Sequence, residues 1–379
     1  MRIDLPTPLL GGLSPRQFMA RHWQKQPLLI RQAVPGIQPL LKRAELFALA
    51  AHSSVESRLV EREGRRWLLR QGPFKRRALP KVDKTKWTLL VQGLDLHVAA
   101  AHELLERFRF VPDARLDDLM LSYATNGGGV GPHLDSYDVF LLQVQGAREW
   151  RIGRVTTPRL SKTAPLKILT NFQAEQSWVL EPGDMLYLPP LWAHEGTARG
   201  ECMTASIGFR APTEHAMAHG LLQRWLDAPP DTPLQHGATA THYRDAGQGA
   251  TDAPGRIPPP LRQFAEAALR RELADPRHLD CVLGELLSEP KADIVFESNA
   301  PLRRGLALRL DPRSRMLYDD QHVFINGESF RAGGRDATLL RRLADRHELA
   351  TTDLAGLSAQ ARTLLDEWVR CGWLRMEGA

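Results

Sequence analysis

Residues 127–150 read GGGVGPHLDSYDVFLLQVQGAREW, and the pattern of this stretch decides the fold. Three consecutive glycines and a Gly-Pro pair come first, and a run that predicts a β-strand follows. Because side chains alternate between the two faces of a strand, His133, Asp135 and Tyr137 are expected to point to the same face. An imidazole and a carboxylate two residues apart on one face could supply two ligands of a metal site.

A further imidazole is available at His194, in the segment GDMLYLPPLWAHEGTA, where a Pro-Gly-Asp turn precedes a short apolar strand. Two imidazoles and one carboxylate with open positions form the facial triad of non-haem Fe(II) oxygenases. The alternatives are a buried ion pair between His133 and Asp135, and a surface-loop histidine near Glu195. We predict that His133, Asp135 and His194 bind one divalent metal and are the catalytic residues.

Arg148 belongs to the sequence Gly-Ala-Arg-Glu-Trp at 146–150, which we expect to be a turn into the next strand. An arginine inside a mostly apolar barrel needs an anionic partner, and a bidentate guanidinium–carboxylate pair meets that need. A dicarboxylic co-substrate that chelates the metal at one end would be held by Arg148 at the other. The alternative is a structural ion pair with a neighbour such as Glu149.

Around this stretch, the segment from 118 to about 209 is expected to be all β. Gly and Pro-Gly turns separate short strands at intervals typical of an antiparallel barrel or sandwich. Earlier in the chain, residues 14–34 predict a helix that ends at Pro27 and is followed by a strand, and a hairpin is expected to turn at Glu63-Gly64. The expected strands of the barrel are DLMLSYA, HLDSYDVFLLQV, REWRIG, QSWVLE, MLYLPP and ECMTASIGF.

The second half of the chain predicts helices and then a mixed segment. Residues 213–290 contain three helical patterns, interrupted by a Pro-, Gly-, Asp- and Thr-rich linker at 228–258. Their apolar faces fit either a core or an oligomer contact, and we expect a homodimer. Residues 291–379 combine a hairpin with an Asn-Gly turn, two helices and a final strand, an arrangement similar to a winged helix. Because the two helices carry both signs of charge, we expect a protein contact there and no direct nucleic-acid binding.

The composition of the chain limits the number of domains and the class of protein. The 379 residues suffice for two or three domains, and 43% hydrophobic and 25% charged residues are typical of a globular protein. Three widely spaced cysteines without a CxxC argue against disulfides and cysteine-based zinc sites, and suit a reducing cytosol. The beginning of the chain lacks a signal-peptide core, and no apolar run predicts a membrane span. We therefore expect a cytoplasmic protein, whose net charge of +6 favours acidic partners such as RNA or a ribonucleoprotein.

The motifs carry a family resemblance. His133-x-Asp135, the distal His194 and the Gly-x-Arg-x-Trp turn resemble the JmjC (jumonji-type) Fe(II)/2-oxoglutarate oxygenases. The segments FMARHWQKQPLLIR, LEPGDMLYLPPLWAHEG and SIGFRAP, together with the glycine stretch, are similar to the bacterial ribosomal oxygenases. Many JmjC proteins have lysine where this chain has Arg148.

The resemblance implies the architecture of the whole chain. It implies an α+β fold in which residues 1–212 form a double-stranded β-helix (jelly-roll, cupin-like JmjC) barrel. A helical dimerisation region at 213–290 and a winged-helix-like domain at 291–379 would follow. The barrel motifs are specific, whereas the last two segments match only in kind.

The resemblance also implies an activity. The chain would be a dioxygenase that uses Fe(II), 2-oxoglutarate and O2 to hydroxylate an arginine of a large-subunit ribosomal protein at Cβ (3-hydroxylation). Arg148 would bind the distal carboxylate of 2-oxoglutarate. Ser122, Asn126 or Thr204 would assist, and we favour Ser122 as the cofactor-binding residue.

An arginine substrate requires a carboxylate near the metal and an apolar surface for its stem. Asp118, Met120 and Ser122 alternate on one face of the strand before the glycines, and Tyr137 is expected to share the face of His133. We predict that Asp118 binds the guanidinium and that Met120 and Tyr137 wall the stem. Alternatively, Asp118 is a solvated residue at the start of a strand.

Two other functions remain open from the sequence. One is an oxygenase of the same class that acts on a histidine or another residue of a different protein. The other is a cupin-like metal-binding regulator with a nucleic-acid-binding winged helix. Arg148 and the complete triad argue against the regulator, because a pure binding module needs neither an open metal position nor a co-substrate anchor.

Overall fold

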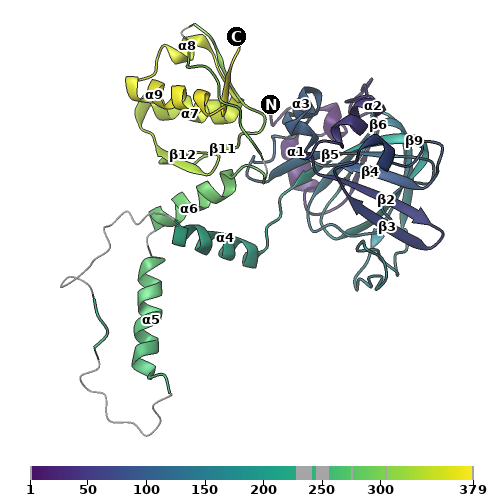
Figure 1. Cartoon of the computed structure of the whole chain (residues 1–379), viewed down its shortest axis with the longest axis horizontal. Helices are drawn as coiled ribbons and strands as arrows, with labels where there is room; N and C mark the ends of the chain where they lie inside the picture. Colours follow the sequence, from purple (N-terminus) through teal and green to yellow (C-terminus); the bar gives the residue numbers. More distant parts are fainter. Residues whose placement is uncertain are drawn as a thin grey trace. The chain divides into compact units, whose positions relative to one another are not determined.

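The computed structural model describes residues 2–227, 241–244, 256–274, 276–292, 294–303 and 305–377. The chain forms two compact units, Met1–Ala211 and Pro212–Ala379 (Figure 1). The helical segment that follows the barrel is thus grouped with the C-terminal part of the chain. Most of the linker expected at 228–258 lies outside the described residues. Within the described residues, no helix has both the length and the apolar character needed to span a membrane.

The first unit is built on an antiparallel nine-stranded sheet, which confirms the predicted antiparallel barrel and the α+β class. The strand order is β1-β8-β6-β9-β5-β4-β2-β3, and β7 pairs with β6. The strands are β1 (Leu28–Ile30), β2 (Ser57–Glu63), β3 (Arg66–Gln71), β4 (Trp87–Val91), β5 (Leu116–Ala124), β6 (Val139–Arg154), β7 (Gln176–Leu180), β8 (Met185–Leu188) and β9 (Trp192–Phe209).

The long strand β6 corrects the prediction of two separate strands joined by a turn at 146–150. β6 runs without a break and pairs with β9 along its length, with register shifts between Gln143 and Ala147. Gly146 lies at this irregularity with a φ of +62°. A Cβ added there would lie 2.2 Å from the carbonyl oxygen of Glu201. The glycine therefore marks a bulge in a continuous strand, and not a chain reversal.

Short helices cover the barrel before β5. Ser14 caps α1, since its Oγ accepts a hydrogen bond from the Gln17 amide and the Gln17 side chain accepts one from the Ser14 amide. The predicted end at Pro27 is wrong: α1 ends at Arg21, and Gln24 adopts a left-handed φ of 56°. The helices are η1 (Pro8–Leu10), α1 (Pro15–Arg21), α2 (Arg43–Leu49), η2 (Arg76–Ala78), η3 (Leu94–Leu96) and α3 (Ala99–Glu106).

An aromatic core fixes the segment that enters β6. Phe18 of α1, Phe140 of β6 and Tyr187 of β8 are fully buried, and each pair of their rings has centroids within 5.4 Å. The Tyr187 hydroxyl donates a 2.6 Å hydrogen bond to the buried carboxylate of Asp138. The other oxygen of Asp138 accepts from the Gln24 side-chain amide at 3.1 Å. These contacts anchor the residue immediately before β6.

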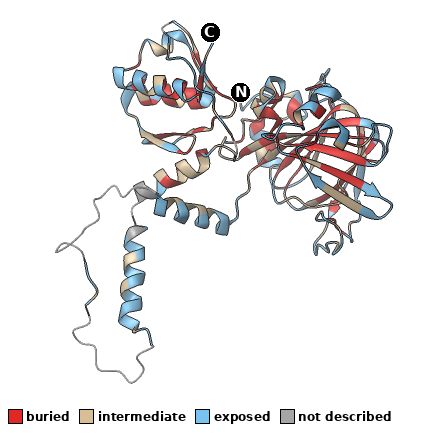
Figure 2. Cartoon of the chain, in the orientation of Figure 1, coloured by how far each residue is buried: buried red, intermediate tan, exposed pale blue. Residues whose placement is uncertain are grey.

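The second unit joins three helices to a compact α+β region. Figure 2 shows α4 and α5 as mostly exposed, whereas one face of α7 and of α9 is buried. Two three-stranded sheets have the orders β14-β10-β15 and β11-β12-β13. The helices are α4 (Glu214–Asp227), α5 (Pro259–Glu272), α6 (Pro276–Ser288), α7 (Gly334–Arg346), α8 (Thr351–Leu354) and α9 (Ala359–Arg370). The strands are β10 (Leu308–Leu310), β11 (Met316–Tyr318), β12 (His322–Ile325), β13 (Glu328–Arg331), β14 (Glu348–Leu349) and β15 (Leu374–Met376).

The hairpin predicted at the Asn-Gly pair is confirmed. Asn326 and Gly327 join β12 to β13, and both have positive φ, as a type I′ turn requires. The sequence prediction missed β10 and β14, which are only three and two residues long. Such short strands lack the alternation that identifies a strand from sequence.

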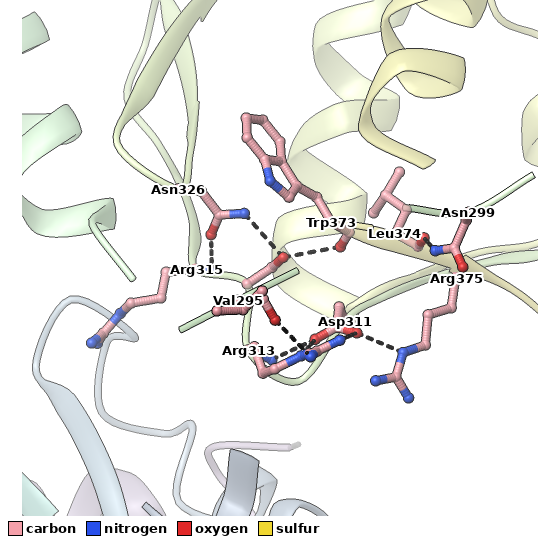
Figure 3. Close-up of polar contacts among 10 residues, drawn as sticks. Val295, Asn299, Asp311, Arg313, Arg315, Asn326, Trp373, Leu374 and Arg375 are labelled. Carbon is pink, nitrogen blue, oxygen red and sulfur yellow. Dashed lines mark hydrogen bonds and ion pairs between the residues drawn. The ribbon is translucent and has the colours of Figure 1, made fainter. Parts of the chain in front are cut away.

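A buried carboxylate ties the loop after β10 to the last strand (Figure 3). Asp311 is 1% exposed and accepts hydrogen bonds from the guanidinium groups of Arg313 and Arg375. Next to it, the Ser314 hydroxyl donates to the carbonyl oxygen of Trp373 at 3.0 Å. Burial opposes ionisation of Asp311, but the hydrogen bonds from Arg313 and the charges of both arginines outweigh it and lower the pKa of the carboxyl group.

Replacing Asp311 with asparagine is expected to lower the free energy of unfolding of the second unit by about 2 kcal/mol, because a hydrogen bond to a charged group contributes about 1.5–3 kcal/mol. The lowered pKa means that the ionised group stabilises the fold above the ordinary carboxyl pKa of about 4, and that this stabilisation is lost as the pH falls through the folded value. The difference between the two proteins should therefore shrink in acid. Hydrogen exchange of peptides from 308–331, measured in urea at several pH values, checks this.

The control is Asp345→Asn, since Asp345 accepts only an exposed hydrogen bond from the Tyr318 hydroxyl. It should change the exchange of the same peptides little. Equal effects of the two substitutions, or a difference that grows in acid, would contradict the role given to Asp311.

Candidate active site

A backbone bridge in the first unit brings the two histidines together. The His133 amide donates to the His194 carbonyl and the His194 amide donates to the His133 carbonyl, both at 3.0 Å. The ring centroids are 4.2 Å apart. Residues 61 positions apart in the sequence thus become direct neighbours, because His194 lies on β9 and the segment before β6 pairs with it.

The strand predicted for His133, Asp135 and Tyr137 is not formed. β6 begins only at Val139, and residues 133–138 form the single bridge and a bend. Strand alternation therefore does not place these three side chains. The imidazole and carboxylate converge because the bridge holds His133 in place and the Leu191 amide donates a 2.9 Å hydrogen bond to the Asp135 carbonyl.

The donor atoms fit a metal. The Nε2 atoms of His133 and His194 lie 3.9 and 3.6 Å from the carboxylate oxygens of Asp135, and the ligand atoms of the three residues all lie within 4.8 Å of one another. Each Nδ1 faces a carbonyl oxygen, that of Gly131 at 2.9 Å and that of Trp192 at 3.0 Å. Donation from Nδ1–H leaves the Nε2 lone pair directed at the shared point, as metal-binding histidines require.

Burial lowers the pKa of His194, and the neighbouring His133 lowers it further. The side chain is 3% exposed, which excludes the alternative of a surface-loop histidine. The nearby Glu195 forms an ion pair with Arg151 and is not a partner of His194. His194 is therefore held neutral, in the form that binds a metal.

Glycines allow the close approach of the strands around the triad. A Cβ on Gly129 would lie 2.3 Å from the Gly196 carbonyl oxygen, and one on Gly196 would lie 2.7 Å from the Trp150 ring. Gly131 has a φ of +77°, and a Cβ there would meet the side chains of Ile168 and Trp67. The glycine run therefore reflects lack of space as well as turn geometry.

Arg148 is a buried cation with unsatisfied donors. The residue is 5% exposed, and its Nη1 makes a long 3.4 Å hydrogen bond to the Ser122 Oγ. Its Nε and Nη2 have no hydrogen-bond partner. Buried guanidinium groups need an anion or several acceptors, because desolvation of the charge is otherwise uncompensated. This side chain fits a carboxylate ligand.

The alternative of a structural ion pair with Glu149 is wrong. Glu149 pairs with Arg199 at 3.1 Å and accepts from the Ser177 hydroxyl, on the opposite face of β6 from Arg148. Hydrogen bonds from Arg199 lower the pKa of Glu149. The charge of Glu149 is therefore already neutralised by Arg199, outside the barrel interior.

One cavity of about 390 Å³ is lined by all eight of the predicted site residues. It is lined by the triad, by Arg148 and Ser122, and by Asp118, Met120 and Tyr137. The space suits one small co-substrate and one side chain. From the sequence we favoured Ser122, with Asn126 and Thr204 as alternatives. In the structure Ser122 lines the cavity, whereas Asn126 is exposed and Thr204 donates to the Gln143 side chain.

The three predicted substrate residues lie at different depths. Asp118 is 3% exposed, so the alternative of a solvated strand-start residue is wrong, and its Oδ2 accepts a 2.8 Å hydrogen bond from the Gly93 amide. Tyr137 also lines the cavity but is 39% exposed. Partial burial and the carboxylates of Asp135 and Asp118 raise the pKa of Tyr137, which keeps its hydroxyl protonated.

Several lining residues were not identified from the sequence. Arg58 of β2 donates a 2.9 Å hydrogen bond to the Gln92 side chain, and both line the cavity. Trp150 lies beside Arg148 and His194, with centroid distances of 5.7 and 5.9 Å. Lys167 and Ile168 come from the loop between β6 and β7. They come from separate elements and share no sequence motif, so only the fold identifies them.

Comparison with known proteins agrees with this geometry. A family model described as a JmjC domain matches residues 103–217, and one described as a ROXA-like winged helix matches residues 271–375. The chain is 32% identical over 331 residues to the ribosomal protein uL16 3-hydroxylase of Escherichia coli, covering 84% of this chain and 86% of that protein. It is 27% identical to a probable ribosomal oxygenase of Haemophilus influenzae, covering 96% of each.

A solved structure extends the similarity over both units. The ribosomal oxygenase YcfD of E. coli in complex with cobalt and 2-oxoglutarate has a TM-score of 0.80 and 30% identity, covering 97% of this chain and 99% of that one.

Arg148→Ala is expected to weaken 2-oxoglutarate binding while leaving metal binding nearly intact. Truncating one partner of a charge-assisted contact in a dry pocket costs about 2–5 kcal/mol, which corresponds to roughly 30-fold to several-thousand-fold in affinity. Arg148→Lys should retain part of the affinity, because lysine keeps the positive charge but lacks the planar guanidinium that binds a carboxylate through two parallel hydrogen bonds. Calorimetric titration of the Mn(II)-loaded protein with 2-oxoglutarate measures this.

Two variants serve as controls. Arg199→Ala removes an exposed arginine from the outer surface and should leave both affinities unchanged. His194→Ala should abolish Mn(II) binding. Unchanged 2-oxoglutarate affinity in a folded, metal-loaded Arg148→Ala protein would rule out this arginine as the co-substrate anchor.

Proposed function

Because this chain belongs to the family of JmjC-domain ribosomal oxygenases, we propose that it hydroxylates an arginine of a large-subunit ribosomal protein at Cβ, using Fe(II), 2-oxoglutarate and O2. The printed function of the E. coli relative identifies uL16 as the first substrate to test. The observation that carries the proposal is the buried, incompletely paired guanidinium of Arg148 in the same cavity as the His-Asp-His triad.

Each residue has a distinct role in this proposal. His133, Asp135 and His194 hold the iron, and Arg148 with Ser122 holds the distal carboxylate of 2-oxoglutarate. When bound, the iron supplies the oxidising chemistry that couples decarboxylation of 2-oxoglutarate to hydroxylation of a C–H bond.

The charges of the cavity favour arginine over histidine as the substrate. Asp118 and Asp117 both line the cavity, and Asp117 lies 3.5 Å from Arg210. A guanidinium is always charged and presents five donors, whereas an imidazole is largely neutral at pH 7. A carboxylate such as that of Asp118 would therefore favour the guanidinium over a neutral imidazole. Met120 supplies a flexible apolar surface for the methylene stem, and Tyr137 closes one side of the opening.

The proposal is tested by intact-mass analysis of uL16 after incubation with enzyme, Fe(II), 2-oxoglutarate and O2. An addition of about 16 Da, localised by fragmentation to Cβ of one arginine, is expected. Asp118→Asn should reduce this modification strongly, because the substrate guanidinium loses its charged acceptor. It should not change the 2-oxoglutarate affinity.

Glu149→Gln is the matched control, since it neutralises a carboxylate on the opposite face of β6. It should leave hydroxylation unchanged. Modification of a histidine, or of no residue in any ribosomal protein, would contradict the arginine assignment.

We also propose that the chain acts as a homodimer in the cytoplasm, through the helices of 213–290. No residue of α4 is buried. Leu226 of α4 is 80% exposed and Leu222 is 46% exposed, and Leu261 and Leu269 of α5 are exposed as well. Apolar side chains on successive helix turns that lack cover within one chain are typical of an oligomer interface.

A double substitution, Leu222→Glu with Leu226→Glu, is expected to convert the dimer to a monomer, because it places two charges in an apolar contact. Light scattering at micromolar concentration measures the mass. Val295→Glu, at a residue that is 74% exposed outside these helices, is the control and should leave the dimer intact. A wild-type protein of monomer mass would end the dimer proposal.

A further inference from the structure

The net positive charge of the protein is concentrated in one short stretch. Residues 61–86 contain ten lysines and arginines and three acidic residues, a net charge of +7. The whole chain, with 50 basic and 44 acidic residues, has a net charge of +6. Everything outside this stretch is therefore close to neutral. An Arg-rich composition would spread its charge, so this concentration calls for a local explanation.

These charges form a surface on the barrel. The stretch comprises the end of β2, all of β3, the short helix η2 and the loop to β4, and every lysine and arginine in it is exposed. We call it the basic hairpin surface, residues 61–86. Figure 1 shows β2 and β3 side by side at the edge of the first unit. The sheet order places β3 at the end of the sheet, where it has one strand neighbour.

Most of the cations have no acidic partner. Glu61 is paired with Arg70 and Lys84. Among the described residues no ion pair involves Arg65, Arg66 or the run Lys75-Arg76-Arg77. Aromatic rings hold some guanidinium groups without neutralising them, as Phe47 does for Arg76 at 5.2 Å. The surface therefore presents a field of unneutralised positive charge.

The basic hairpin surface adjoins the wall of the active-site cavity. Trp67 of β3 packs against Gly131, two residues before the metal ligand His133. Ile168, which lines the cavity, packs against the same glycine. A polyanion on the hairpin would therefore lie close to the active-site cavity.

We propose that the basic hairpin surface binds the phosphate backbone of RNA and so directs the enzyme to a ribosomal protein that is bound to RNA. Six of the ten cations are arginines, whose planar forks match phosphate oxygens. A membrane surface fits less well, because Val82 is the one exposed large apolar residue of the stretch. The choice of RNA over an acidic protein rests on the proposed function. The proposal departs from our sequence-based expectation of no direct nucleic-acid binding, which rested on the mixed charges of the helices of 291–379 and did not consider this surface.

The test is the salt dependence of binding to a labelled single-stranded RNA of about 15 nucleotides, followed by fluorescence anisotropy. The triple variant Lys75→Glu, Arg76→Glu, Arg77→Glu should weaken binding and reduce the slope of log affinity against log salt by about 2, since each single-strand phosphate contact contributes about 0.7. If this variant does not fold, Arg65→Glu with Arg66→Glu at the hairpin turn replaces it and should reduce the slope by about 1.4.

The matched control reverses three exposed arginines of the second unit, Arg303→Glu, Arg331→Glu and Arg346→Glu. It should keep the wild-type slope. Loss of RNA binding in this control but not in the hairpin variant would assign RNA to the second unit and overturn the proposal. Absence of RNA binding by the wild type, or binding to phosphatidylserine vesicles alone, would also overturn it.

Hydroxylation of a free substrate peptide separates this proposal from the proposed function. The hairpin variant should hydroxylate the peptide at the wild-type rate, because none of its residues lines the cavity. It should modify the substrate protein more slowly than wild type when that protein is bound to RNA. Failure of peptide hydroxylation in the wild-type enzyme would refute the activity and leave RNA binding to be judged on its own.

Discussion

The pair of backbone hydrogen bonds between His133 and His194 is the interaction on which the site depends. It joins a segment that is not a strand to the beginning of β9, and it sets the separation of two metal ligands that lie far apart in sequence. The bridge is possible because glycines at 129 and 196 leave no side chain between the two segments. A metal site built in this way is preorganised by the sheet, since the ligands are placed by main-chain contacts before any ion binds.

The cavity combines two electrostatic environments. The buried guanidinium of Arg148 lacks a full set of acceptors, and the carboxylates of Asp117 and Asp118 line the same cavity. On the proposed assignment, a dicarboxylate binds at Arg148 and a cationic side chain binds at Asp118. Opposite charges within one cavity would thus give the two substrates different partners.

Much of the fold and of the candidate site could be predicted from the sequence, and the physical reason differs between residues. The metal triad and Arg148 were identified because few residue types can do their chemistry, so their identity carries the information. The reason offered for His133 and Asp135, strand alternation, was wrong, because local pattern cannot show that a bridge to β9 replaces a strand. Arg58, Gln92 and Lys167 were missed because tertiary folding alone brings them to the cavity. Gly146 shows the same limit, since a glycine at a bulge and a glycine at a turn look alike in sequence.

The unsatisfied donors of Arg148 also have a consequence for the lifetime of the protein. A buried charge without an anion destabilises the barrel, so the ligand-free protein opens more readily than the loaded one. A ligand that binds only the folded state stabilises it by about 2.7 kcal/mol at a hundred times its dissociation constant. Proteolysis acts on the opened state, so a dicarboxylate bound at Arg148 would slow degradation of the protein. On the proposed assignment, the arginine that binds the co-substrate also makes the resistance of the folded protein to proteolysis depend on that ligand.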